Sequence, residues 1–168
     1  MMRARFGAAI VVAAAAAAMS ACADDDSGSL PPDVAIVERV IDGDTIDVEI
    51  GGRDERVRMI GIDTPELHPD TGTAECMAAE ARDFTAAHLP PGTEVRLERD
   101  VVGRDDYGRL LAYVFRRGDD VLVNELIVAD GYARPLTIAP NDTYRRRFVA
   151  AASTADAAGL GVWSTCAG

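Results

Sequence analysis

The chain is organised around one stretch, Val57-Arg58-Met59-Ile60-Gly61-Ile62-Asp63-Thr64-Pro65-Glu66. It begins as an apolar-rich strand that carries one arginine, and it ends in an aspartate, a turn and a glutamate. Carboxylate oxygens suit a hard cation such as calcium, and a guanidinium group suits a phosphate. Two other stretches are expected to meet it, Ile41-Asp42-Gly43-Asp44-Thr45 and Asp106-Tyr107-Gly108-Arg109.

Hydrophobic patterning around this stretch predicts a small barrel. Val34 to Ile41 is rich in β-branched residues, Asp42-Gly43 is a hairpin signal, and Thr45 to Ile50 alternates apolar and polar residues. We expect strands over 34–41, 45–50, 55–62, 93–100, 110–115 and 121–123, and helices over 73–89, 124–129 and 143–158. This order predicts an α+β fold, a five-stranded Greek-key barrel of the OB type with about three helices packed on it.

Composition predicts one packed domain with an acidic surface. The 168 residues are 48% hydrophobic and 27% charged, which allows a core and argues against wholesale disorder. All 17 basic residues are arginine, yet the net charge is -11, so bulk charge does not favour tight non-specific binding to nucleic acid. A polyanionic substrate would therefore need a local arginine cluster and the help of a bound metal.

The N-terminus is predicted to direct export. Arg3 and Arg5 precede an apolar run that ends at Met19 and is short for a permanent membrane anchor. Small residues directly before Cys22 resemble a bacterial lipoprotein signal, which implies a signal peptide over 1–21 and lipid on Cys22. A plain secretory signal with a chance cysteine is the alternative, and either signal exports the chain.

Residues 22–33 are predicted to form an acidic, flexible tether, because the stretch 23–32, with three aspartates and two prolines, offers nothing to bury. Such a segment would hold a folded domain, residues 34–168, away from a membrane surface. A disordered N-terminus without a function fits the same residues equally well.

The remaining two cysteines are predicted to pair. An oxidising compartment favours a disulfide between Cys76 and Cys166, with two buried free thiols as the alternative. The bridge would fasten the C-terminal end of the chain to the segment that follows Glu66. The spacing of the cysteines does not suggest a zinc site.

Each charged motif is ambiguous when it is taken alone. Asp42-Gly43-Asp44 is most simply a turn, Thr64-Pro65 a helix start, and Arg58 an exposed strand residue. Together, and with Leu111-Ala112-Tyr113, Val123-Asn124-Glu125 and Val162-Trp163-Ser164, they resemble the staphylococcal nuclease family in order and spacing, from about Val37 to Trp163. The resemblance implies an OB-type barrel, calcium dependence, and cleavage of DNA and RNA that leaves 3′-phosphate ends.

The resemblance also implies roles for individual residues. Asp44 and Asp63 match calcium ligands, and Thr64 matches a residue that lends the ion its backbone carbonyl. Glu66 matches the proposed general base, and Arg58 and Arg109 match the two phosphate-binding arginines. Tyr107 matches a tyrosine that contacts the nucleotide, and Asp42 matches an acid close to the ion but outside its ligands.

One departure from the family concerns the nucleotide pocket. The segment Pro135-Leu136-Thr137-Ile138-Ala139-Pro140 has no aromatic residue where the family prototype has a stacking tyrosine. Stacking is worth about 1–3 kcal/mol per base, so affinity and base preference are expected to differ. His68, in the loop after Glu66, is expected to have no chemical role.

Two classes of function follow from these observations. We favour an exported, calcium-dependent nuclease that is a monomer, takes nucleic acid as its substrate, and meets the membrane only through a lipid on Cys22. The alternative is a catalytically weak OB-type lipoprotein that only binds nucleic acid or another ligand. Retention of the acids and arginines of the site favours the enzyme.

Overall fold

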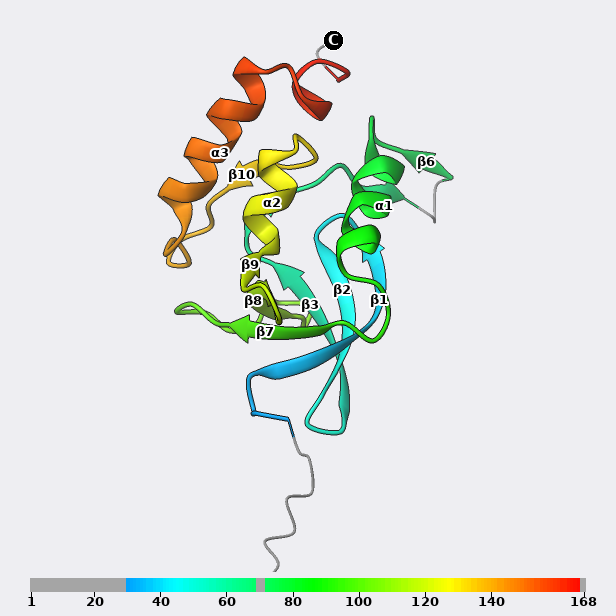
Figure 1. Cartoon of the computed structure of the whole chain (residues 1–168), viewed down its shortest axis with the longest axis vertical. Coiled ribbons are helices and arrows are strands. Elements are labelled where there is room, and N and C mark those ends of the chain that lie inside the picture. Colours follow the sequence, from blue (N-terminus) through cyan, green and yellow to red (C-terminus); the bar gives the residue numbers. More distant parts are fainter. Residues whose placement is uncertain (1–29, 69–71, 167–168) are drawn as a thin grey trace, which may run out of the picture.

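The structure is a computed structural model that describes residues 30–68 and 72–166 (Figure 1). The predictions for the signal peptide at 1–21, for Cys22 and for most of the tether concern residues outside these ranges. Within the described ranges, no helix has both the length and the apolar character needed to cross a bilayer.

A closed barrel of five strands forms the centre of the molecule. The strands are β1 (Val34–Asp42), β2 (Thr45–Ile50), β3 (Arg53–Met59), β7 (Glu94–Glu98) and β8 (Leu110–Arg116). They pair in the order β3-β2-β1-β7-β8, and a parallel pairing of β3 with β8 closes the ring. The other four pairings are antiparallel. The prediction of an OB-type barrel is therefore confirmed.

Five short strands lie outside this ring. Strand β4 (Gly61–Asp63) pairs with β10 (Arg134–Leu136). Strand β9 (Val121–Leu122) pairs with β8 at the edge of the sheet. The other two, β5 (Leu67–His68) and β6 (Thr73–Ala74), pair with each other. The β4–β10 pair matters for function, because its register places Arg134 opposite Asp63.

The helices gather toward one end of the barrel (Figure 1). They are α1 (Ala78–His88), α2 (Val123–Ala129) and α3 (Arg145–Ala157), followed by the 3₁₀ turn η1 (Gly161–Trp163). The fully buried ring of Phe148 on α3 lies 6.1 Å, centroid to centroid, from that of Tyr113 on β8. Gly61 lies against the same ring, since a Cβ there would be 2.4 Å from a Phe148 atom.

Strand alternation determines which side chains of β3 reach the outer surface. Val57 and Met59 are fully buried in the core, so the alternate residues Arg56 and Arg58 point outward. Burial of the two apolar side chains fixes the register of the strand, because a shift by one residue would turn both arginines inward. The core thereby positions the arginines on the outside of the barrel.

Two predicted elements have different bounds in the structure. The strand expected over 55–62 is two strands, β3 and β4, which are separated at Ile60. The helix expected over 73–89 begins only at Ala78, because Thr73 and Ala74 pair with β5 and Met77 adopts a left-handed conformation (φ 67°). Apolar spacing predicts the body of a helix better than its first turn.

Candidate active site

The turn between β1 and β2 delivers two aspartates to the site. The backbone N–H of Asp44 donates to Asp42 Oδ1 at 3.1 Å, and this hydrogen bond fixes the carboxylate of Asp42 next to Asp44. Asp44 is fully buried. Gly43 permits close approach of the next loop, since a Cβ at this position would lie 2.7 Å from the Thr64 side chain.

Three carboxylates converge at this turn. Asp42, Asp44 and Glu66 each place an oxygen within 4.8 Å of the others. Oxygen ligands of this kind suit a hard cation such as Ca²⁺, which takes 6–8 oxygens and accepts water for those that the protein does not supply. The donor set therefore fits the metal that the sequence predicts, with Asp42 among the converging groups rather than behind them.

The charge state of the trio also fits a cation site. Burial is the main cause that raises the pKa of Asp44 from 3.8 to about 7, and the charges of Asp42 and Glu66 act in the same direction. The Arg58 guanidinium and the Thr64 N–H oppose this rise. Burial also raises the pKa of Glu66, with the charge of Asp42 as the next cause. A bound cation would relieve this repulsion.

Arg58 is the central contact of the site. Its guanidinium lies 2.9 Å from Asp44 Oδ2 and 3.1 Å from Asp63 Oδ1, and it also donates to the carbonyl oxygens of Met59 and Ile62. These contacts hold the side chain, 13% exposed, against the acids. Asp63, although expected as a metal ligand, lies outside the converging trio and pairs with Arg58.

Thr64 connects the second acidic loop to the first. Its backbone N–H donates to Asp44 Oδ2 at 2.9 Å, and its side chain packs against Gly43. Its Oγ1 atom is buried and has no hydrogen-bond partner among the described residues. The two loops are thus joined through the buried carboxylate of Asp44.

Arg109 and Tyr107 border the site from the loop before β8. Arg109 Nε donates to Asp105 Oδ2 at 2.7 Å, and the guanidinium lies 5.5 Å from the centre of the Tyr107 ring. Tyr107 is 87% exposed and free to receive a ligand on its face. Both residues line a cavity of about 750 Å³ with Asp42, and a second cavity of about 410 Å³ with Arg58.

The second cavity is bordered by the segment in which the sequence lacks the expected aromatic residue. Leu136, Ile138 and Pro140 line it where the sequence lacks an aromatic residue. Ile138 is 68% exposed, so an aliphatic surface faces the cavity. This segment therefore offers no ring for stacking, as expected from the sequence, and the aromatic residue that lines the cavity is Tyr107.

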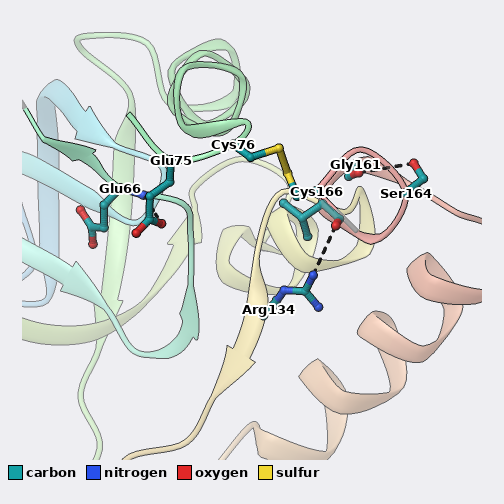
Figure 2. The surroundings of a disulfide bond; sticks show 8 residues. Glu66, Glu75, Cys76, Arg134, Gly161, Ser164 and Cys166 are labelled. Atoms are coloured by element: carbon teal, nitrogen blue, oxygen red, sulfur yellow. Dashed lines mark hydrogen bonds between the residues drawn. A yellow bond between two sulfur atoms is a disulfide. The ribbon is translucent and has the colours of Figure 1, made fainter. Parts of the chain in front are cut away.

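Glu75 is a site residue that the sequence did not reveal. Its Oε2 accepts a hydrogen bond of 3.0 Å from the backbone N–H of Glu66, and it is one cause that raises the pKa of Glu66 (Figure 2). The adjacent Cys76 forms a disulfide with Cys166, as predicted. Glu66 is therefore held by a segment that is covalently joined to the C-terminal end of the chain.

Arg134 connects the same C-terminal segment to Asp63. Its guanidinium stacks on the Trp163 ring at 4.2 Å. It also donates to the Val162 carbonyl at 3.3 Å, and Figure 2 shows Arg134 beside this segment. Its backbone lies opposite Asp63 in the β4–β10 pair. Asp63 and Glu66 are thus each linked to the segment 162–166 through a neighbour, Asp63 through Arg134 and Glu66 through Glu75 and Cys76.

The structure brings most of the predicted site together. The three converging acids are Asp42, Asp44 and Glu66, and Arg58 contacts Asp44. Arg109 lines one cavity together with Asp42 and the other together with Arg58. Asp105, which orients Arg109, was not predicted, because residues 105–109 form a loop in which helical spacing gives no signal.

Comparisons with known proteins agree with this arrangement. Residues 56–165 match the family model described as staphylococcal nuclease homologue. Thermonuclease of Staphylococcus intermedius is 42% identical over 128 residues, which cover 76% of this chain and 74% of that protein. Thermonuclease of Staphylococcus hyicus is 41% identical over the same shares. Endonuclease YncB of Bacillus subtilis is 34% identical over 76% of this chain and 60% of its own. The chain therefore belongs to the staphylococcal nuclease family.

Proposed function

We propose that the protein is a calcium-dependent nuclease that hydrolyses phosphodiester bonds of DNA, RNA or both and leaves 3′-phosphate ends. The observation that carries this proposal is the convergence of Asp42, Asp44 and Glu66 on one point beside Arg58. A chain 42% identical to a thermonuclease has here the acids and the arginines that such chemistry needs.

The two arginines act on the phosphate. A phosphodiester is anionic and gains further charge when a nucleophile adds to phosphorus, and guanidinium N–H groups stabilise that charge. Arg58 and Arg109 border the same cavity, so one phosphate between them can contact both. To do so, each guanidinium gives up part of its pairing with a carboxylate, Arg58 with Asp63 and Arg109 with Asp105.

Glu66 acts on water. Its raised pKa makes the carboxylate a better proton acceptor, and Glu75 fixes the backbone that carries it. Glu66 accepts a proton as the water oxygen bonds to phosphorus. The bond to the 5′-oxygen then breaks, and that oxygen gains a proton from solvent.

The groups that would hold a calcium ion are the carboxylates of Asp44 and Asp63 and the carbonyl of Thr64, with Asp42 beside them; Asp63 would have to leave its pairing with Arg58 to reach the ion. A bound ion supplies charge stabilisation on a non-bridging phosphate oxygen. The ion also lowers the negative charge of the site, which lets an acidic protein accept an anionic substrate.

The proposal extends to location. The signal predicted at 1–21 would export the chain, either with a lipid on Cys22 or as a secreted monomer. The Cys76–Cys166 disulfide supports export, because such bonds persist in oxidising compartments. Metabolic labelling with a fatty acid, with Cys22→Ser as the control, decides between the two forms.

Digestion of single-stranded DNA and of RNA by the purified protein tests the function. We expect cleavage with calcium, none after addition of a chelator, and products that shift on a gel after removal of a 3′-phosphate. Binding without calcium-dependent cleavage would favour the binding-only barrel. Glu66→Gln protein, purified in the same way, is the control for a contaminating nuclease. Its preparation should lack the activity if the activity belongs to this protein.

A further inference from the structure

Two arginines on the barrel face next to the site have no role in the proposed reaction. The register of β1, β2 and β3 places Arg39, Asp47 and Arg56 in one row. Arg39 Nε lies 2.8 Å from Asp47 Oδ2, and Arg56 Nε lies 2.7 Å from Asp47 Oδ1. The arginine side chains are 66% and 46% exposed, whereas that of Asp47 is 13% exposed.

This row carries a net positive charge. Hydrogen bonds from Arg56, and then from Arg39, hold the pKa of Asp47 below its ordinary value, so the carboxyl stays ionised between two guanidinium groups. A guanidinium has five N–H donors, and contact with one carboxylate uses about two of them. Each arginine is therefore fixed in direction by Asp47 and keeps donors for a further anion.

The row adjoins the active site. Arg39 and Arg56 line the cavity of about 750 Å³ that is also lined by Asp42, Tyr107 and Arg109. Arg56 and Arg58 both point outward from β3 and are two residues apart, which corresponds to about 6–7 Å along a strand. This distance is of the order of the separation between neighbouring phosphates in an extended nucleic-acid strand.

Acids also line this cavity and limit what can bind there. Glu55 is held by Arg104 at 2.6 Å, and Asp42 belongs to the acidic trio. Glu38 and Asp54 are the exposed acids that remain in the lining. Water and salt screen exposed charges more strongly than partly buried ones. An anion at this place therefore depends on the two arginines.

We propose that Arg39 and Arg56, oriented by Asp47, form a second phosphate subsite for the nucleotide next to the one that is cut. This inference rests on the proposed nuclease function and adds to it. The preferred substrate is then an oligonucleotide strand with at least two phosphates, one between Arg58 and Arg109 and one in this row.

Two thymidine substrates and a double variant test the proposal. One substrate is a dinucleotide with a single phosphodiester, and the other is a hexanucleotide that can fill the second subsite. For the wild-type protein, kcat/KM should be higher for the hexanucleotide. Arg39→Gln/Arg56→Gln should reduce this gain about tenfold, and Arg39→Lys/Arg56→Lys should retain most of it, since lysine keeps the charge.

Arg117→Gln is the matched control, because Arg117 pairs with Glu94 at 3.1 Å and does not line either cavity of the site. It should leave the gain unchanged. Hexanucleotide binding to the double glutamine variant should also lose salt dependence, by about 0.7 in the slope of log K against log salt for one phosphate contact. Melting curves verify that the variants are folded.

Three results would overturn the proposal: an equal loss on both substrates, no loss on either, or the same loss in the lysine variant. A wild-type protein that cleaves neither substrate would contradict the proposed function itself. The dinucleotide thus reports on the reaction, and the ratio of the two substrates reports on the subsite.

Discussion

Asp44 shows at the scale of one residue how the surroundings of the proposed metal site act on one of its carboxylates. The side chain is fully buried, accepts a hydrogen bond from the Thr64 N–H and forms an ion pair with Arg58. Burial nevertheless raises its pKa to about 7. A carboxyl in this state carries a proton for much of the range below neutral pH. Binding of a cation has to displace that proton.

Calcium affinity should therefore depend on pH. As pH rises toward the pKa of Asp44, we expect the dissociation constant for calcium to fall about tenfold for each pH unit. Above pH 7 it should no longer change. Calorimetric titration between pH 5.5 and 8.5, in buffers of different ionisation enthalpy, measures both the affinity and the released proton. An affinity that does not change over this range would contradict the raised pKa.

The same residue makes the metal-free protein less stable as pH rises. Because the pKa of Asp44 in the folded state lies above its value of 3.8 in the unfolded chain, the folded state holds more protons between pH 4 and 7. The contribution of Asp44 to the free energy of unfolding is thus present at pH 4 and is lost as pH rises through 7. Urea unfolding at pH 5 and 7.5 should show calcium stabilising the protein more at the higher pH.

Removal of the proposed base tests the chemistry at this scale. Glu66→Gln keeps the size of the side chain and removes its ability to accept a proton. We expect kcat to fall about 100- to 10,000-fold, with little change in the melting temperature. Single-turnover measurements with excess enzyme isolate the chemical step, and unchanged turnover would remove Glu66 from the mechanism.

At the scale of elements, two loops and a strand assemble the site. The β1–β2 turn supplies Asp42 and Asp44, the end of β3 supplies Arg58, and the segment after β4 supplies Glu66. Strand periodicity predicted these elements because buried apolar residues alternate with the functional ones. The contact of Glu75 with Glu66 could not be predicted, since it depends on the pairing of the two-residue strands β5 and β6, which places Glu75 beside Glu66.

That contact can be tested with a pair of variants. Glu75→Ala removes the acceptor of the Glu66 N–H and should lower kcat about tenfold, because the base loses its fixed position. Glu75→Gln retains an acceptor oxygen and should recover most of that loss. Equal activity of the two variants would show that the hydrogen bond has no part in positioning Glu66.

A second element contact should be important for stability. The buried Asn124 at the start of α2 accepts from the Val114 N–H at 2.9 Å and donates to the Ile60 carbonyl at 2.9 Å. Asn124→Leu leaves both backbone groups without this partner. We expect the free energy of unfolding to fall by about 2–4 kcal/mol in urea. Ser153→Ala, on the exposed face of α3, is the control and should have almost no effect.

At the scale of the whole molecule, the barrel, its closure and the disulfide followed from the sequence, but parts of the outer structure did not. Strands β4 and β10 form one pair, although the paired residues Asp63 and Arg134 lie 71 positions apart in the sequence. Short strands of two or three residues have no period to detect, and their pairing depends on how the closed barrel brings distant segments together. The sequence did predict Asp63 and Arg58 in one site, but it did not predict that the two side chains would form an ion pair.

The disulfide gives a prediction that concerns the whole chain. The bond joins residues separated by 90 positions, and its loop contains α1, β7, β8, α2 and α3. A bridge of this length should contribute about 4–5 kcal/mol to the free energy of unfolding in the chain-entropy model. Cys76→Ser/Cys166→Ser should unfold at correspondingly lower urea, and wild-type protein in reductant should match it. Reductant should leave the variant unchanged.

Because Cys76 adjoins Glu75, we also expect the reduced protein to lose turnover before it unfolds. If activity and structure were lost together, the disulfide would have no part in positioning Glu66.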